Sequence, residues 1–290
     1  GDFDRLFDVP VSQKLRQLQR KIDELAGTHP GAPPRAMALV DKPNPSNVKI
    51  FIRGSADNRG AEAPRQFLEI LAGANRKPFE KGSGRLELAQ EIASPRNPLT
   101  ARVLVNRVWQ HHFGEGLVAT VDNLGVTGAK PTHPELLDYL ATEFVRSGWK
   151  LKPLHRLIVT SATYRQGGAL RDAVYAVDPE NKLLWRYPLQ RLDAESVRDA
   201  ILFTCGEISL DVGGPYVPTK VNSHGQVVVD DAVAGAKRRS LYLQQRRTQP
   251  LTMLDVFDTA RMNPNCTRRN PSTVSLQSLA LLNSDFIRAR

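Results

Sequence analysis

A succession of helix start and stop signals in residues 97–166 constrains the fold of this chain more than any other feature of its sequence. Short polar residues and proline favour the first turn of a helix, and glycine favours the position just after its last turn. Such residues stand at the ends of three segments with helical periodicity. These start and stop residues are Asn97, Pro98, Gly114, Thr132, Glu135, Gly148 and Pro153. We therefore predict three consecutive helices, the second of which opens with a capping box formed by Thr132 and Glu135.

Segments on both sides of this block extend the helical pattern. Within residues 11–27, Leu15, Leu18 and Ile22 recur at the spacing of three and four that is typical of an amphipathic helix. Further helices are predicted at residues 83–93, 193–206 and 272–282. The last of these has Ser272 or Thr273 as its expected cap.

Residues 206–246 differ in character from the rest of the chain. Glycine, proline and β-branched residues replace the helical pattern there, which is typical of turns and short strands. Residues 238–247, RRSLYLQQRR, alternate well enough to be a strand. We predict a mainly α, multi-helix globular domain with a small β-containing insert near residues 206–246.

The pattern also predicts a division of the chain into parts. A lead-in helix is expected at residues 1–27. A linker with a short strand and a loop is expected at residues 28–82, where proline and glycine interrupt any regular pattern. The remaining residues, 83–290, are expected to form the helical core.

Charge indicates the kind of partner that the chain could bind. The formal net charge is +10, and 28 of the 40 basic residues are arginine. Arginine binds carboxylate, phosphate and sulfate groups through its planar fork of donors. The basic excess must face water or an anionic partner. No apolar run approaches the ~18 residues needed to cross a bilayer, so we expect no membrane span.

Polar and aromatic residues of the helices are the candidate binding residues. Arg102, Asn106 and Gln110 are spaced i, i+4 and i+8, so they share one helix face. This face could hold a sugar, a base or an anion, or it could form a buried polar network that joins helices. The candidate binding residues are Arg102, Asn106, Trp109, His112, Tyr164, Arg165, Arg191 and Arg198.

Three residues are candidates for acid–base chemistry, although no catalytic motif accompanies them. Glu195 and Asp199 lie four residues apart on one predicted helix, and burying them together would raise the pKa of one carboxyl. The alternative is that Arg191 and Arg198 pair with these carboxylates. His133 stands at a helix start, where the helix dipole favours a neutral imidazole.

The sequence does not have the residue spacing of a metal site. His111 and His112 are adjacent, so on a helix they point about 100° apart and cannot meet one metal ion. No HExxH or CxxC spacing occurs, and we expect no metal site and no cofactor within this chain. Cys205 is predicted to be a small buried hydrophobic residue and Cys266 to lie in a polar loop, and a disulfide between them is an open question.

Several segments occur in an order that resembles a known family. They read NPLTARVLVNRVWQHHFGEGLV, PTHPELLDYLATEFVRSGWKLKPLHRLIVTSATYRQ, DPENKLLWRYPLQRLDAESVRDAIL, GGP, RRSLYL and STVSLQSLALLNS. They resemble the planctomycete-type PSD domain, also called domain of unknown function 1553, and the likeness extends from about Val48 to the C-terminus. The resemblance implies a large bacterial protein exported from the cytoplasm, often with a cytochrome c-like module.

This resemblance carries no catalytic residues over to the chain. The chain also has no CxxCH haem-attachment motif, so haem is expected only on a domain outside this sequence. We expect an extracytoplasmic, Arg-rich binding or docking module for an anionic polysaccharide or a fused cytochrome c-like partner. The alternative is a hydrolytic or redox enzyme acting on polysaccharide-derived material. Nucleic acid is not an expected partner, because no helix-turn-helix, zinc-finger or RNP pattern occurs.

Overall fold

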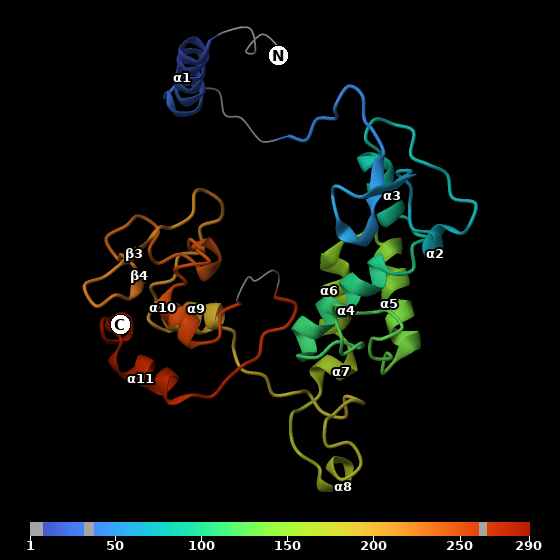
Figure 1. Cartoon of the computed structure of the whole chain (residues 1–290). Helices are drawn as coiled ribbons and strands as arrows, with labels where there is room; N and C mark the ends of the chain where they lie inside the picture. The colour runs from blue at the N-terminus through green and yellow to red at the C-terminus, as the bar shows by residue number, and fades with distance from the viewer. Residues whose placement is uncertain (1–7, 32–37, 261–265) are drawn as a thin grey trace. The chain divides into compact units, whose positions relative to one another are not determined.

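The computed structural model describes residues 8–31, 38–260 and 266–290, and it divides into two compact units, Gly1–Glu91 and Ile92–Arg290 (Figure 1). Over the described residues helices are far more extensive than strands, and the strands form two small sheets of two strands each. The chain is therefore mainly α, as the periodicity predicts.

The first unit contains one long helix and one hairpin. Its elements are α1 (Val9–Thr28), β1 (Val48–Phe51), η2 (Ile52–Gly54), β2 (Arg59–Ala63), α2 (Glu69–Ala72) and α3 (Arg85–Ile92), the last of which ends one residue inside the second unit. Asp8 starts α1, because its side chain accepts a hydrogen bond of 3.3 Å from the backbone N–H of Val11. β1 and β2 pair antiparallel, and β1 lies within residues 28–82, where a short strand is predicted.

Four helices of the second unit enclose the first of its two hydrophobic cores. They are α4 (Thr100–Phe113), α5 (Pro134–Arg146), α6 (Leu151–Val159) and α7 (Ala162–Arg165), and the short α8 (Asp172–Tyr175) follows. α4 and α5 lie side by side (Figure 1). Buried apolar residues recur every three or four positions, which places them on one face of each helix. The core includes Val105, Trp109, Phe113, Leu117, Leu137, Leu140, Phe144, Leu154 and Ile158.

The helix boundaries follow the predicted signals with small shifts. α4 begins at Thr100 rather than directly after Asn97, because the Asn97 side chain accepts a backbone hydrogen bond and holds a turn before the helix. Gly114 ends α4 with a φ of 81°, a conformation that favours glycine. The predicted capping box of α5 does not form. His133 occupies its N-cap, and the Thr132 hydroxyl donates to a carbonyl of the preceding loop.

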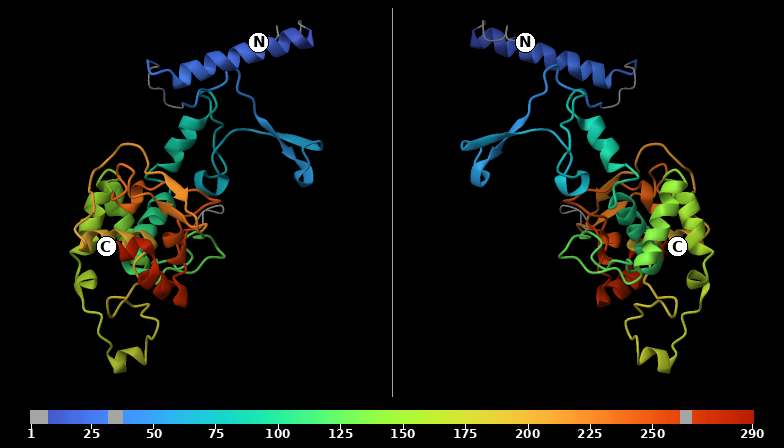
Figure 2. Two further views of the ribbon diagram at one scale, coloured as in Figure 1. Left: turned by 90° about the vertical axis from the view of Figure 1, so that its left-hand side faces the viewer. Right: turned by 90° about the vertical axis from the view of Figure 1, so that its right-hand side faces the viewer.

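The second core of this unit includes the predicted β-containing insert. Its elements are α9 (Ala194–Thr204), β3 (Thr219–Val221), β4 (Val227–Val229), η3 (Ser240–Tyr242), α10 (Thr252–Val256), α11 (Ser275–Asn283) and α12 (Asp285–Arg288). β3 and β4 form an antiparallel hairpin, drawn in orange in Figure 2. The buried apolar residues of this core are Ala194, Val217, Leu243, Leu251 and Leu254.

The prediction of a strand at residues 238–247 was wrong. This segment contains η3, because Asp199 Oδ1 accepts hydrogen bonds of 2.7 Å from both the backbone N–H and the hydroxyl of Ser240. These two bonds hold the backbone in a turn. Within the described residues the segment pairs with other strand-like segments only through isolated bridges, from Arg238 to Ser209 and from Leu243 to Val217.

The prediction that Cys205 is buried was also wrong. α9 ends at this residue, so its side chain lies at the C-cap and is exposed. The thiol lies 3.7 Å from the backbone oxygen of Arg290. Cys266 is exposed as well and both thiols are free, so no disulfide joins them.

Candidate functional site

The candidate residues fall into two sets that belong to different cores. Arg102 and Asn106 belong to α4 in the first core, whereas Glu195 and Arg198 belong to α9 in the second. Within the part of the chain that the structure describes, no hydrogen bond or ion pair joins the two sets. The sequence-predicted residues therefore do not build one common site.

Arg102 and Asn106 form the polar network that was the alternative to a binding face. Arg102 Nε donates to Asp138 Oδ1 at 2.6 Å, which ties α4 to α5 and lowers the pKa of the Asp138 carboxyl. The fully buried Asn106 donates to the carbonyl of Val118 and accepts from its N–H, both at 2.9 Å. Both groups of that residue are thus satisfied by one side chain.

Arg198 is an internal support of the second core. Its side chain is only 2% exposed, and its guanidinium donates to the carbonyls of Ala236 and Arg238 at 2.8 and 3.0 Å and to the Ser240 hydroxyl at 3.2 Å. Burial lowers the pKa of Arg198 to about 10, and the Asp199 carboxylate opposes this shift. The residue remains charged at neutral pH and is not available to a ligand.

Arg191 and Glu195 connect α9 to the C-terminal segments. Arg191 donates to the backbone oxygen of Ser272 and to Gln277 Oε1, the latter at 3.0 Å. Glu195 receives a two-pronged contact from Arg269, with N–O distances of 2.5 and 3.1 Å. Burial raises the pKa of Glu195, but the Arg269 hydrogen bond and charge outweigh it, so the net shift is downward. The raised pKa that a general acid needs is therefore absent at Glu195.

The Glu195–Arg269 pair predicts a loss of stability in acid. A carboxylate with a depressed folded-state pKa stabilises the fold above its unfolded pKa of about 4.3, and this contribution is lost as the pH falls through the folded value. We expect the melting temperature of the wild-type chain to fall more steeply below about pH 4.3 than that of Glu195→Gln. The check is calorimetry across this range, with Glu24→Gln in the exposed α1 as control. Parallel curves for wild type and Glu195→Gln would contradict the assignment.

The other two acid–base candidates lie apart from Glu195. Asp199 is occupied by the backbone and hydroxyl of Ser240. His133 lies at the N-cap of α5, where Nδ1 contacts the hydroxyl of Thr132 at 3.0 Å. No pair of these three residues shares a partner among the described residues, so no acid–base constellation forms.

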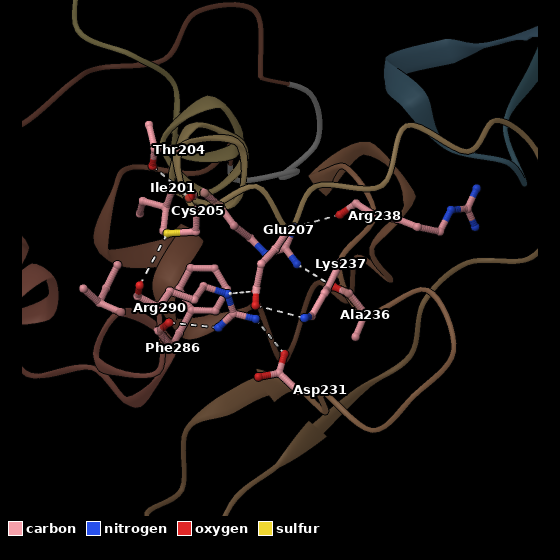
Figure 3. A network of polar contacts seen from close by, with 12 residues as sticks. Ile201, Thr204, Cys205, Glu207, Asp231, Ala236, Lys237, Arg238, Phe286 and Arg290 are labelled. Carbon is pink, nitrogen blue, oxygen red and sulfur yellow. Dashed lines mark hydrogen bonds and ion pairs between the residues drawn. The ribbon is translucent and has the colours of Figure 1, made fainter.

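A further polar network of the second core was not predicted from the sequence (Figure 3). Arg290 lies over the ring of Phe286 and forms ion pairs with Glu207 at 2.8 Å and with Asp231 at 2.9 Å. Lys237 also donates to Glu207, at 3.0 Å, and this bond lowers the pKa of that carboxyl. The network joins three segments that are far apart in the sequence, and its two positive and two negative side chains neutralise one another.

Aromatic rings meet in a continuous series inside the first core. Trp109 stacks on Phe113 with ring centroids 4.3 Å apart, and Phe113 contacts Tyr164 and Tyr187 at 5.9 and 6.0 Å. The ring of His112 lies 5.5 Å from Tyr164. Trp109, His112 and Tyr164, three of the candidate binding residues, therefore do come together. They do so mainly as packing partners.

A cavity of about 650 Å³ opens beside the Trp109 end of this series. We call it the Trp109 pocket. Its apolar side is formed by Trp109, Phe113, Leu117 and Leu184, and its charged residues are Glu115, Lys130, Glu180, Lys182 and Arg186. An apolar cavity with a few charged groups at its edge is the usual form of a site for a small ligand.

The charges of the Trp109 pocket are not all neutralised internally. Lys182 and Glu180 pair at 2.5 Å, and hydrogen bonding to Glu180 raises the pKa of Lys182. Lys130 forms no ion pair with a described residue. Arg186 lies over the Trp185 ring at 5.2 Å, and its buried Nε has no hydrogen-bond partner in the described chain. An anion could satisfy that donor.

Sequence reasoning missed Lys130 and Arg186 and included residues that are structural. Lys130 and Arg186 lie in loops, outside any periodic pattern, and the WRY run at residues 185–187 was the only local sign. Arg165, a predicted binding residue, is exposed at the end of α7, and its side chain forms no hydrogen bond or ion pair with a described residue. It does not line the pocket.

Comparisons with known proteins identify a family but no activity. Within the described residues no helix is long and apolar enough to cross a bilayer, and no cluster of three or more His, Cys, Asp or Glu could hold a metal ion. No curated protein and no solved structure matches the chain significantly. The family model of PSD1, described as a protein of unknown function (DUF1553), matches residues 84–290, and the chain therefore belongs to this family.

Proposed function

We propose that residues 92–290 form a non-catalytic binding module and that the Trp109 pocket holds an acidic saccharide, such as a uronate or a sulfated sugar. The observation that carries the proposal is the coincidence of an apolar, ring-lined cavity with the unpaired donor of Arg186. Sugar rings pack on aromatic and apolar surfaces, and a carboxylate or sulfate group suits the arginine fork.

The contacts of the other candidate arginines support placing the ligand in the Trp109 pocket. Arg102, Arg191 and Arg198 are engaged by carboxylate, carbonyl and amide oxygens of the protein itself. Releasing them would leave those oxygens unsatisfied, which costs about 1–3 kcal/mol for each buried group. Binding a ligand through Arg186 Nε or Lys130 does not break a hydrogen bond or ion pair of this kind. An arginine-rich chain therefore offers few of its arginines to a ligand.

Binding of acidic oligosaccharides is the expected result. A survey with uronate, sulfated and neutral oligosaccharides should find binding by the acidic ones, weakening from about 0.05 to 0.5 M NaCl because the contacts are partly screened. Arg186→Gln should weaken binding about 10- to 100-fold, since a charge-assisted hydrogen bond contributes roughly 1.5–3 kcal/mol. Isothermal titration calorimetry measures both effects.

The matched control is Arg165→Gln, which removes one positive charge outside the pocket. It should leave the affinity nearly unchanged. Equal losses for the two variants would show that net charge rather than the pocket holds the ligand. Affinity that does not respond to salt would contradict the role of Arg186 and Lys130.

The other expectations from the sequence stay predictions. A hydrolytic or redox activity on polysaccharide-derived material is not favoured, because Glu195 and Asp199 are occupied by Arg269 and Ser240. A fused cytochrome c-like partner and an extracytoplasmic location rest on the family's usual companions, and no feature of the described residues bears on them.

A further inference from the structure

Two histidines from different helices meet on the side of the ring series away from Trp109. His112 lies in the last turn of α4 and His155 in the middle of α6, and His112 Nε2 is 2.8 Å from His155 Nδ1. The two rings lie edge to face, with centroids 5.1 Å apart. Of the six histidines in the chain, these are the two whose ring nitrogens contact each other in the described structure.

The position of His112 is set by contacts on three sides. Its backbone oxygen accepts hydrogen bonds from the Tyr187 hydroxyl at 2.9 Å and from Gln190 Nε2 at 3.1 Å. Its ring packs against the edge of Tyr164. His155 is exposed, so its ring can rotate with little cost. One nitrogen ligand is therefore held in place and the second can adjust to it.

We propose that His112 and His155 form a two-histidine binding site for a transition-metal dication such as Cu²⁺ or Zn²⁺, with water or an exogenous ligand completing the coordination. Neutral imidazole is the usual nitrogen ligand for these ions. Zinc–nitrogen bonds of about 2.0–2.1 Å in tetrahedral geometry place two ligand nitrogens roughly 3.3 Å apart. A separation of 2.8 Å needs to widen only slightly to reach this geometry.

A metal ion can replace the hydrogen bond between His112 and His155 without a net loss of protons from the two rings. In the metal-free pair one of the two contacting nitrogens donates and the other accepts. When a metal binds, the donor ring keeps its proton by moving it to its other nitrogen. The other nitrogens, His112 Nδ1 and His155 Nε2, have no hydrogen-bond partner among the described residues.

The surroundings select the class of metal. The described residues supply no carboxylate or thiolate as a third ligand. Lys152 and Arg156 flank His155 on α6 and add positive charge. Hard cations such as Mg²⁺ prefer oxygen ligands and should not bind, whereas Cu²⁺ should bind most tightly according to the order of affinities along the first-row metals.

Titration of the full chain with CuCl₂, ZnCl₂ and MgCl₂ tests the proposal. We expect one equivalent of Cu²⁺ to bind, Zn²⁺ to bind more weakly and Mg²⁺ not to bind. Electron paramagnetic resonance should show nitrogen coupling from two imidazoles at the first equivalent of Cu²⁺. His155→Ala and, independently, His112→Asn should each weaken the site at least about tenfold, because each removes one of two protein ligands.

His111→Ala is the matched control, since it removes an exposed neighbouring histidine that is not part of the pair. His155 is exposed, so its replacement should leave the circular dichroism spectrum and melting temperature unchanged. Retained Cu²⁺ affinity in both His155→Ala and His112→Asn, or an equal loss in His111→Ala, would overturn the proposal. A signal from a single imidazole in the wild-type protein would overturn it as well.

Discussion

Replacing Arg198 by alanine is expected to unfold the second core at temperatures at which the wild-type protein is intact. The side chain is 2% exposed, and its guanidinium satisfies two backbone carbonyls and one hydroxyl in the 236–240 segment. Alanine would leave these groups buried without donors and would open a cavity the size of the arginine side chain. Breaking a buried polar network of this kind costs about 3–5 kcal/mol.

The measurement is thermal and urea unfolding of the full chain, monitored by circular dichroism. For a unit of about 200 residues this loss corresponds to a decrease in melting temperature on the order of 10 °C. Arg198→Lys keeps the charge but not the fork, so its loss should be intermediate. The control Arg165→Ala should change stability by less than about 0.5 kcal/mol, as exposed substitutions do. A loss below about 1 kcal/mol for Arg198→Ala would mean that the network is not formed.

Asn106→Leu is expected to destabilise the first core by about 2–6 kcal/mol. Leucine resembles asparagine in shape but cannot hydrogen-bond, so both the N–H and the carbonyl of Val118 lose their partner. Each buried group left unsatisfied costs about 1–3 kcal/mol. The loop around Gly116 already lies against the side chain of residue 106, since a Cβ atom added to Gly116 would be only 2.8 Å from the Asn106 amide. The loop therefore cannot move closer to compensate for the lost hydrogen bonds. That contact leaves no space for a larger rearrangement.

Gln110→Leu provides the matched control for this second prediction. Gln110 is a buried amide one turn further along α4, and its side chain makes no hydrogen bond to a described residue. Its replacement should therefore be close to neutral. The denaturant midpoint of Asn106→Leu should be lower than that of Gln110→Leu, because only Asn106→Leu removes the hydrogen bonds to Val118. Equal midpoints would show that the Asn106–Val118 bonds contribute nothing to stability.

The sequence predicted the helices because their signals are local. The glycine at 114 and the apolar spacing of α4 act within a few residues of the helix that they define. The alternation of RRSLYLQQRR predicted a strand, and this prediction failed because Asp199, 41 residues away, holds Ser240 in a turn. A tertiary contact of this kind overrides local propensity.

The partners of the polar residues could not be predicted for the same reason. Glu195 pairs with Arg269, 74 residues away, and no spacing rule links positions so distant. Arg198 bonds to backbone carbonyls, which every residue carries and no sequence motif marks. The Trp109 pocket is formed largely by loops, and no repeating sequence pattern predicts the backbone conformation of a loop. Trp109 itself was identified because it lies on a helix.

Mapping a bound acidic oligosaccharide on the protein by nuclear magnetic resonance tests the central claim most directly. The claim is that the Trp109 pocket, rather than the arginine-rich surface, holds the ligand. We predict saturable shifts of the Trp109 indole N–H and of the backbone amides of Leu117, Lys130 and Arg186. The indole of Trp149, which packs on Phe144 outside the pocket, should not move. Shifts confined to exposed basic residues such as Lys152 and Arg156, with Trp109 unchanged, would contradict it.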